Sequence, residues 1–594
     1  MDAATAEELL KLLSAGNELL SHCGDGLSRE PDEAAAALDE LKRLIRSAEE
    51  RTVGEDKPNR VREICKNIDY YIDKRKEEQD DGSARFDFRY CLSSLYRILE
   101  FELAYLAEDF VDKTAYPALY PDIGTVDRGE ITRKGREAGI PVSVVVLSYN
   151  HLDYARSCVE SILEHTQEGQ YELILVDNGC TDGTGSYFDS VPGAKVIHLP
   201  CNLHVVKGFN IGLMAAEGTY SAAVCDDFLF TENWLNNLLV CLRSDDGIGY
   251  VSPGATNISN LQRIDVPFVS PEEFQEEARK FNRSDPRKWE ERVVLLPNVL
   301  CCPTALLDRI GYYDTRFYRG EFADDDISFR IRRAGYRLIY CGDTVTHHYG
   351  SVTTAADHAS NSLQEGKETF FQKYGLDAWA DARMDTIYQN FSYDRCSRVG
   401  SILGIDIKCG ATLLQIKNEI WRRFGVCPAL FSATTEEKYL PDLRTISRDA
   451  VVVRNFGGLP GRFHRKFDLI YMEKSLDCFS EDLDAVFSGL SKLMEPGGQL
   501  IFRLDNCASF RRIVGLFQSG EESLNRKNYR EESVCRTAES YGFRKLRSLC
   551  LINRERLQAI RRLSHAVAEG EEEDRALQEL LLKETTVYQM ICGG

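Results

Sequence analysis

Hydrophobic positions in the first part of the chain recur at the spacing of an α-helix. Leucines follow this spacing between residues 9 and 44 and again between 92 and 103, which is typical of helices with one apolar face. Glycine and aspartate cluster at 23–26 and 79–82 and indicate loops. We expect a helical region over residues 1–125 that carries no catalytic motif and is a candidate surface for oligomerisation.

From residue 141 onward, short apolar runs alternate with helical patterns. The runs have the length of buried strands, and the segments between them have the spacing of helices, which together predict a parallel, doubly wound α/β sheet. Polar residues follow the ends of these runs, at the edge where such sheets bind ligands. The expected strands are 142–147, 173–176, 196–197 and 222–225.

A second α/β alternation begins near Val399 and includes a strand at 499–504. An acidic stretch at 569–574 indicates a helical, partly solvated end to the chain. The sequence thus predicts a multidomain α/β protein. The expected parts are a helical N-terminal region (1–125), a first α/β domain (140–375), a linker (376–397), a second α/β domain (398–550) and a helical C-terminal tail (551–594).

Composition excludes several classes of partner and site. The 594-residue chain is too long for one core, and its net charge of −21 argues against a nucleic-acid partner, which needs a basic face. The 19 cysteines form no CxxC pair, so neither a zinc site nor a disulfide framework is expected. Early acidic residues and the lack of a long apolar run predict a cytoplasmic protein without a transmembrane segment.

Two acidic groups carry the clearest chemical signal. Three aspartates stand in a row at 324–326, ahead of a predicted helix, and a His347-His348 pair follows the next strand. Asp226-Asp227 ends an earlier apolar run. Carboxylates this close repel one another unless a cation or a proton offsets the charge. The pattern indicates a metal-assisted transfer site; the alternative is negative charge at a helix N-terminus, where it is favourable.

The ordered motifs of the first α/β domain resemble those of family 2 glycosyltransferases, which have the GT-A fold. They span about 140–375 and read PVSVVVLSYNHLDYARSCVESIL, ELILVDNGCTDGT, CNLHVVKGFNIGL, VCDDF, ADDDISFRIRRAGY and THHYGS. The resemblance implies an inverting, metal-dependent glycosyltransferase that takes a nucleotide-diphospho-sugar of the UDP or dTDP type. It also implies a bacterial surface glycan or a protein as the acceptor.

For the donor, the resemblance assigns Asp177, Ser148 and Asn150 to the pocket for the uracil or thymine base. Asn202 and Lys207 match the family's loop and helix start, where phosphate binds favourably. Other interpretations stay open. Asp177 also suits the cap of a turn, and Lys207 also suits an ordinary surface position.

The acidic pair resembles the family's DxD-type metal motif, with Cys225 in place of its first acid. The resemblance assigns Asp227 to Mg²⁺ or Mn²⁺ and Asp226 to donor binding, in keeping with the preference of hard cations for carboxylate oxygen. His347 matches the histidine that completes this metal site. His348 is the alternative.

Asp324 matches the family's catalytic base, although Ala323 replaces the glutamate that normally precedes it. The resemblance implies that Asp324 deprotonates an acceptor hydroxyl, which attacks the anomeric carbon from the face opposite the leaving group. Asp326 and Arg330 match the later acid and the arginine of the same motif, and Arg330 is assigned to donor binding.

The second α/β domain resembles class I S-adenosylmethionine-dependent methyltransferases in VGSILGIDIKCGATLLQIKN, KFDLIYMEKSLDCF and LSKLMEPGGQLIFRLDN. Its cofactor loop keeps only Gly410 of three glycines, and no acidic residue for the ribose is evident near 429–432. We therefore expect a domain that has lost catalysis and organises an acceptor. Two alternatives stay open: a bifunctional glycosyltransferase and methyltransferase that binds S-adenosylmethionine, and a scaffold that binds a nucleotide sugar without transfer.

Overall fold

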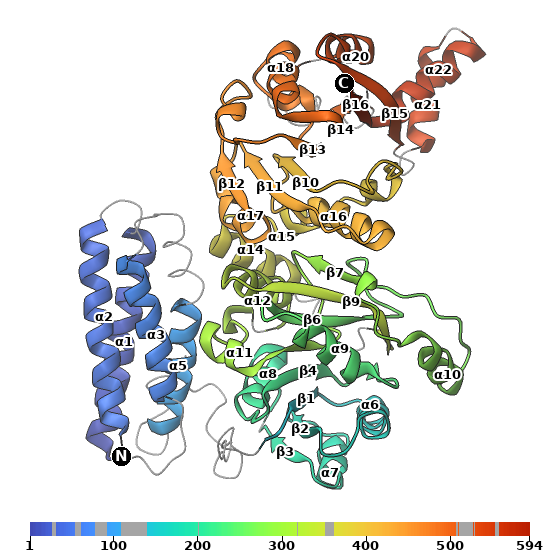
Figure 1. Ribbon diagram of the computed structural model, residues 1–594. Helices are drawn as coiled ribbons and strands as arrows, with labels where there is room; N and C mark the ends of the chain where they lie inside the picture. Colours follow the sequence, from blue (N-terminus) through green and yellow to red (C-terminus); the bar gives the residue numbers. More distant parts are fainter. Residues whose placement is uncertain are drawn as a thin grey trace. The chain divides into compact units, whose positions relative to one another are not determined.

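The protein is described by a computed structural model and forms two compact units, Met1–Arg383 and Met384–Gly594 (Figure 1). Each unit is considered by itself. The described residues are 1–26, 31–53, 61–77, 92–107, 139–199, 201–317, 319–350, 361–506, 509, 527, 529–552, 557–568 and 570–593.

The N-terminal region consists of long helices, as the leucine spacing predicts. Their buried faces carry the spaced apolar residues, including Leu9, Leu41 and Leu99, because an amphipathic helix is stable once its apolar stripe is covered. Residues 108–125 of the predicted helical region lie outside the described residues. The helices are α1 (Ala3–Gly26), α2 (Pro31–Thr52), α3 (Val61–Glu77) and α5 (Ser93–Ala107).

The first α/β sheet begins with parallel strands in the order β3-β2-β1-β4. Every residue of β1 is buried, as expected of a parallel strand covered by helices on both faces. These strands are β1 (Val142–Ser148), β2 (Tyr171–Asp177), β3 (Lys195–His198) and β4 (Tyr220–Cys225), and their helices are α6 (Leu152–His165), α7 (Thr184–Asp189) and α8 (His204–Met214).

The other half of this sheet is mixed and brings distant motifs together. Strand β8 is antiparallel to β4 and β6, whereas β9 is parallel to β6. The short β5 pairs with the end of β9, so that Phe228 lies opposite His348. These strands are β5 (Phe228–Leu229), β6 (Ile248–Ala255), β7 (Trp289–Arg292), β8 (Leu300–Pro303) and β9 (Arg337–His348). The helices are α9 (Trp234–Arg243), α10 (Pro271–Phe281), α11 (Thr304–Ile310), α12 (Ala323–Arg333), α14 (Ser362–Tyr374) and α15 (Ala378–Ala382).

The second unit contains a seven-stranded sheet in the order β12-β11-β10-β13-β14-β16-β15. The first five strands are parallel and doubly wound, and β16 runs antiparallel between β14 and β15. The strands are β10 (Ser401–Ile405), β11 (Ala429–Thr434), β12 (Asp449–Val452), β13 (Phe467–Met472), β14 (Met494–Asp505), β15 (Phe543–Ile552) and β16 (Lys583–Cys592). The helices are α16 (Ala411–Phe424), α17 (Leu440–Ile446), α18 (Leu483–Leu493), α20 (Glu531–Ser540), α21 (Leu557–Val567) and α22 (Glu571–Leu582).

The prediction of a helical C-terminal tail is wrong for its last part. Residues Lys583–Cys592 form β16, and Val587, Tyr588 and Met590 are buried in the core of the second sheet. The acidic residues at 571–574 form the first turn of α22, whereas the segment after this helix is rich in β-branched and aromatic residues, which favour a strand. The second domain therefore extends well beyond residue 550.

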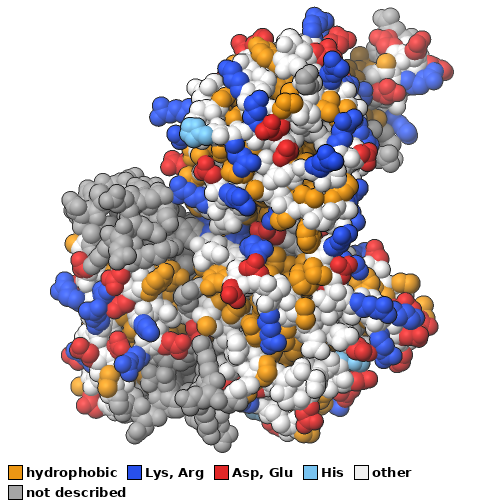
Figure 2. All heavy atoms as spheres, in the orientation of Figure 1, with side chains coloured by type: hydrophobic (Ala, Val, Ile, Leu, Met, Phe, Trp, Pro, Cys, Tyr) orange, Lys and Arg blue, Asp and Glu red, His pale blue; other side chains and the backbone are white. Residues whose placement is uncertain are grey.

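The multidomain α/β fold class and the helical N-terminal region are otherwise as predicted. Basic and acidic side chains are interspersed over the visible face (Figure 2). Among the residues that the structure describes, no helix is long and apolar enough to cross a membrane.

Candidate functional site

Strand ends of the first sheet bring three predicted donor-binding residues to one edge. Asp177 ends β2, where its carboxylate accepts a hydrogen bond from the Cys180 backbone N–H at 2.7 Å. The side-chain oxygen of Asn150 accepts from the Thr181 N–H at 2.9 Å. The Ser148 hydroxyl donates to Oδ2 of Asp226 at 2.5 Å, which links the ends of β1 and β4. The parallel pairing of β2, β1 and β4 produces this arrangement.

His198, which the sequence interpretation did not single out, lies between two carboxylates. Its Nδ1 is 2.8 Å from Oδ2 of Asp177 and its Nε2 is 2.9 Å from Oδ1 of Asp189. Both ring nitrogens therefore donate, which requires the charged imidazolium. Burial lowers the pKa of His198, but the bonds to the two aspartates outweigh it, so the pKa is raised. The sequence feature that could have identified His198 is its position at the end of β3.

Asn202 and Lys207 lie in the predicted loop and helix. The Asn202 side-chain oxygen accepts from the His204 N–H at 2.8 Å and from Nδ2 of Asn178 at 3.0 Å. Lys207 is half-buried on α8. The following Gly208 lets α8 lie close to β1, since a Cβ there would stand 2.6 Å from Leu147. The loop thus fixes the start of α8 against the sheet.

The acidic pair at the end of β4 is only half exposed. Burial and the charge of Asp227 together raise the pKa of Asp226 to about 7, in spite of the hydrogen bond from Ser148. Oδ2 of Asp227 lies 3.1 Å from Nε2 of His348. Asp227 and the imidazole of His348 thus offer oxygen and nitrogen ligand atoms at the edge of the sheet.

The structure brings His348, rather than His347, to Asp227. Successive side chains of β9 point to opposite faces, and the pairing of β5 with β9 places His348 on the side of the acidic pair. His348 stacks on Phe228 with ring centroids 4.4 Å apart and lies 2.6 Å, through Nδ1, from the Asn257 carbonyl. His347 instead hydrogen-bonds through Nδ1 to the Thr256 hydroxyl at 2.6 Å.

The first turn of α12 carries the three aspartates in three different environments. Asp324 is half-buried and Asp325 and Asp326 are buried. Burial raises the pKa of Asp324, against the opposing charge of Arg383. Burial and the charge of Asp324 raise the pKa of Asp325 to about 8, although Arg383 lies 3.4 Å from its carboxylate.

Asp326 and Arg330 belong to a buried ionic network. Nε of Arg330 donates to Asp326 at 2.8 Å, and Nζ of Lys373, from α14, lies 2.5 Å from the other carboxylate oxygen. Burial would raise the pKa of Asp326, but Lys373 and Arg330 lower it. Arg330 also donates to the carbonyls of Ile310, Gly311 and Tyr312. The structure therefore places Arg330 inside the core, where it holds α12, and not at the surface of a donor pocket.

Tyr313 is buried, and this burial raises the pKa of its hydroxyl. Asn210 of α8 fixes the backbone of Tyr313, because its side chain donates to the Tyr313 carbonyl at 2.8 Å and accepts from its N–H at 2.9 Å. These two hydrogen bonds tie α8 to the segment that precedes α12.

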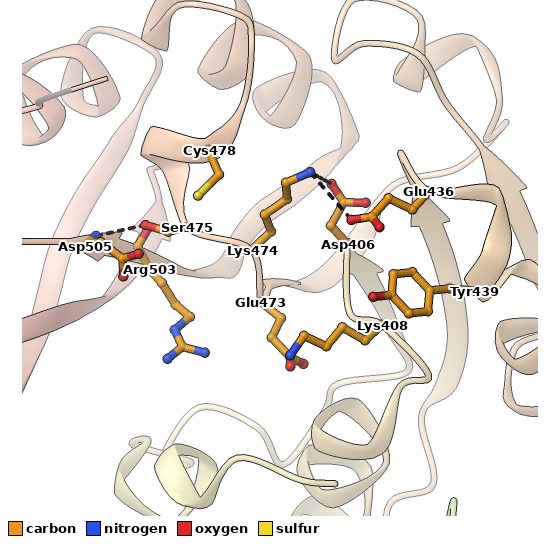
Figure 3. A pocket seen from close by; sticks show the side chains of 10 residues that line it. All are labelled: Asp406, Lys408, Glu436, Tyr439, Glu473, Lys474, Ser475, Cys478, Arg503 and Asp505. Carbon is orange, nitrogen blue, oxygen red and sulfur yellow. Dashed lines mark hydrogen bonds and ion pairs between the residues drawn. The ribbon is translucent and has the colours of Figure 1, made fainter. Parts of the chain in front are cut away.

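The second unit has its own cavity, of about 370 Å³, at the carboxyl ends of β10, β11, β13 and β14 (Figure 3). Lys474 points between Asp406 and Glu436, with Nζ 3.7 Å and 4.0 Å from their carboxylates. Lys408 and Glu473 point toward one another in the same cavity. Further lining residues are Tyr439, Ser475, Cys478, Arg503 and Asp505.

The loop after β10 keeps the backbone of a glycine-rich turn, although only Gly410 of the three expected glycines is present. Asp406, Lys408 and Gly410 have φ of 47°, 52° and 84°, values that L-residues with side chains rarely adopt. The side chains of Asp406 and Lys408 consequently line the cavity. Asp406 is further held by the Thr435 N–H and hydroxyl, at 2.5 Å and 2.9 Å.

Glu436 is an acidic residue just beyond the range 429–432, in which the sequence shows none. Strand β11 continues to Thr434, and Glu436 follows two residues later as a lining residue of the cavity.

Comparisons with known proteins identify relatives of the first α/β domain. The model of the family "Glycosyl transferase family 2" matches residues 143–289. Glycosyltransferase GlyG of Streptococcus pneumoniae is 33% identical over 216 residues, which cover 34% of this chain and 69% of that protein. An uncharacterized glycosyltransferase of Haemophilus influenzae is 31% identical over 111 residues, 18% of this chain. The chain spans about a third of the length of that relative, 34%.

Two kinds of solved structure are similar to parts of this chain. The mannosyltransferase PcManGT from Pyrobaculum calidifontis, in complex with GDP-Man and Mn2+, has a TM-score of 0.30 and 19% identity over 41% of this chain and 67% of its own. The magnesium protoporphyrin IX methyltransferase ChlM from Synechocystis PCC 6803, with bound SAH, has a TM-score of 0.25 and 9% identity over 35% of this chain and 81% of its own. On the family match and the similarity to GlyG, the chain belongs to glycosyl transferase family 2.

Proposed function

We propose that the protein is an inverting, metal-dependent glycosyltransferase that uses a nucleotide-diphospho-sugar of the UDP or dTDP type. One observation carries the proposal: in a chain of this family, the pairing of β5 with β9 brings His348 to within 3.1 Å of Asp227, which lies 121 residues earlier in the chain. This pair suits a divalent cation, and the half-buried Asp324 suits a base. A bacterial surface glycan or a protein is the proposed acceptor.

For donor binding, the proposal uses the strand ends of the first half of the sheet. Asp177 and Asn150 would accept and donate hydrogen bonds to the base edge, with Ser148 beside them. The N-terminus of α8 and Lys207 would favour the diphosphate, because the first N–H groups of a helix attract anions. His198 supports this pocket, since it orients the Asp177 carboxylate through Nδ1.

The residues at the acidic pair suit Mg²⁺ or Mn²⁺. Asp227 supplies a carboxylate oxygen and His348 an imidazole nitrogen. The geometry of His348 fits this role, because its Nδ1 lies 2.6 Å from the Asn257 carbonyl, and a metal-ligating histidine commonly donates its other N–H to such a group. A divalent cation held there would neutralise charge on the departing nucleoside diphosphate.

Asp324 is the proposed base. Its half-buried carboxylate would accept the proton of an acceptor hydroxyl, and the hydroxyl oxygen would bond to the anomeric carbon as the bond to the diphosphate breaks. Burial raises the pKa of Asp324 and strengthens it as a proton acceptor. The buried Asp326–Arg330–Lys373 network holds α12, and with it Asp324, in place.

Thermal unfolding against a panel of nucleotide sugars, with and without MnCl₂, tests the proposal. A ligand at about 100 times its Kd stabilises the folded state by about 2.7 kcal/mol, so the true donor should raise Tm more when Mn²⁺ is present. The stabilising donor is then incubated with acceptors, and NMR of the product should show the inverted anomer. A retained anomer, or a panel without any stabilising sugar, would contradict it.

A second candidate is a scaffold that binds a nucleotide sugar without transferring it. Cys225 and Ala323, which replace acids of the family motifs, favour this function. Release of nucleoside diphosphate from the bound donor distinguishes the two candidates, because a scaffold would bind the sugar and leave it intact.

A further inference from the structure

An aromatic pair borders the proposed base. Trp379, on α15, is 46% exposed although tryptophan has a large apolar surface. One of its faces stacks on Phe322, with ring centroids 5.4 Å apart and planes inclined by 28°. Phe322 is buried and stands two residues before Asp324 in the chain.

The backbone at Phe322 is strained. Its φ is 64° and its ψ is 5°, directly before the first residue of α12. A bulky residue in this left-handed region is an outlier, and such strain persists where the surrounding structure requires it and clusters at functional sites. The strained conformation presents the phenyl ring to Trp379 at the start of the helix that carries the base.

A second contact anchors the same segment against α12. Arg383, four residues after Trp379, lies 3.4 Å from Oδ1 of Asp325. Trp379 itself is held at the start of α15 by its N–H, which donates to the Asp377 carboxylate at 3.0 Å. Contacts on both sides of Trp379 therefore fix a half-exposed indole beside the three aspartates.

We propose that the exposed face of Trp379 is a platform for a sugar ring of the acceptor, and that the acceptor is therefore a saccharide. This inference rests on the proposed function. A pyranose has an apolar face of C–H groups, and these suit the negative face of an indole. The ring would stack there while one hydroxyl reaches Asp324. That hydroxyl loses its proton to Asp324, and its oxygen bonds to the anomeric carbon as the donor's diphosphate leaves.

Two measurements on the full chain test the platform. The first is binding of lactose, maltose and N,N′-diacetylchitobiose by saturation-transfer NMR, which needs no turnover. The second is release of nucleoside diphosphate from the donor, with and without each sugar, expressed as a ratio for each variant. Trp379→Ala should lose binding by about tenfold or more, and the ratio should fall toward one. Trp379→Phe should restore much of both.

Phe371→Ala is the matched control, because Phe371 is another half-exposed aromatic residue of this unit, 58% exposed on α14. It should leave both measurements unchanged. Equal sugar binding by the wild-type protein and Trp379→Ala would overturn the platform, as would a wild-type protein that binds none of the sugars. Sugar binding that depends on Trp379, in a protein that never cleaves a nucleotide sugar, would support the platform and contradict the proposed function.

Discussion

The two α/β sheets place carboxylates at the same kind of edge but neutralise them differently. In the first unit, burial raises the pKa of Asp226 and of Asp324. In the second unit, burial raises the pKa of Glu473 to about 7, but Lys474 reaches toward both Asp406 and Glu436. Asp226 and Asp324 thus favour an added proton or metal ion, whereas Asp406 and Glu436 have a lysine between them.

The comparison shows that two sheets of similar architecture can have different charged groups at the same edge and can therefore suit different functions. Parallel strands deliver polar residues to one edge irrespective of chemistry, and a fold by itself does not establish an activity. The charge balance at that edge decides what binds. An unbalanced acidic group suits a cation and a base, and a balanced one suits a structural or docking role.

Removal of the proposed base should give the largest effect. Asp324→Asn keeps the shape of the side chain but cannot accept the acceptor proton, so transfer should fall about 10²- to 10⁴-fold. Initial rates with saturating donor and Mn²⁺ measure the effect. Donor-dependent thermal stabilisation is the control, and it should persist. Transfer at the wild-type rate would remove Asp324 from this role.

A pair of histidine variants should separate the two candidates for the metal site. His348→Ala removes the imidazole that faces Asp227, so the Mn²⁺ concentration for half-maximal activity should rise about 10- to 100-fold. His347→Ala should change it little, because this ring bonds to Thr256. Titration of activity with MnCl₂ measures both. The opposite ranking would restore His347 as the ligand.

The pH dependence of unfolding should reveal the unbalanced charge on α12. Asp325 has a folded-state pKa of about 8, above its unfolded value, so the native state binds the extra proton between those values and loses stability as pH rises through that window. Asp325→Asn should raise Tm at pH 8.5 and change it little at pH 5. Asp246→Asn, at an exposed position, is the control. An equal shift at both pH values would contradict this cause.

Removal of Lys474 should leave a net negative charge at one side of the cavity in the second unit. Lys474→Ala leaves Asp406 and Glu436 without the cation between them, and the loss of stability should be about 1 kcal/mol or less, since the pair is partly solvated. Chemical unfolding of the full chain measures it. We expect titration calorimetry of the wild-type protein with S-adenosylmethionine to give no heat. Measurable binding would instead support the bifunctional enzyme.

The smallest expected effect concerns His198. Its raised folded-state pKa means that its ion pairs stabilise the protein below the unfolded pKa, and this contribution is lost as pH rises through the folded value. Donor affinity should weaken over the same range, because a neutral His198 keeps one N–H and can no longer donate to both Asp177 and Asp189. His198→Gln should flatten this pH profile in donor titrations. An unchanged profile would show that Asp177 is oriented without His198.

The sequence by itself determined the types of secondary structure and the sheet edge at which the candidate functional residues lie. Leucine spacing gave the N-terminal helices, and alternating apolar runs gave two α/β sheets. Ser148, Asp177 and Asp226 could be assigned to one edge because parallel strands all end there. These inferences depend on local periodicity and on a general rule of sheet architecture, so one chain is sufficient for them.

Only the tertiary structure decided which side chains meet. The pairing of β5 with β9 selects His348 over His347, and the packing of α12 takes Arg330 into the core. Strand β16 lies between β14 and β15 in the second sheet, and the stacking of Trp379 on Phe322 places an indole at the start of α12. Each of these depends on contacts between residues far apart in the chain, or on the face to which a side chain points, and neither is encoded in local hydrophobic spacing.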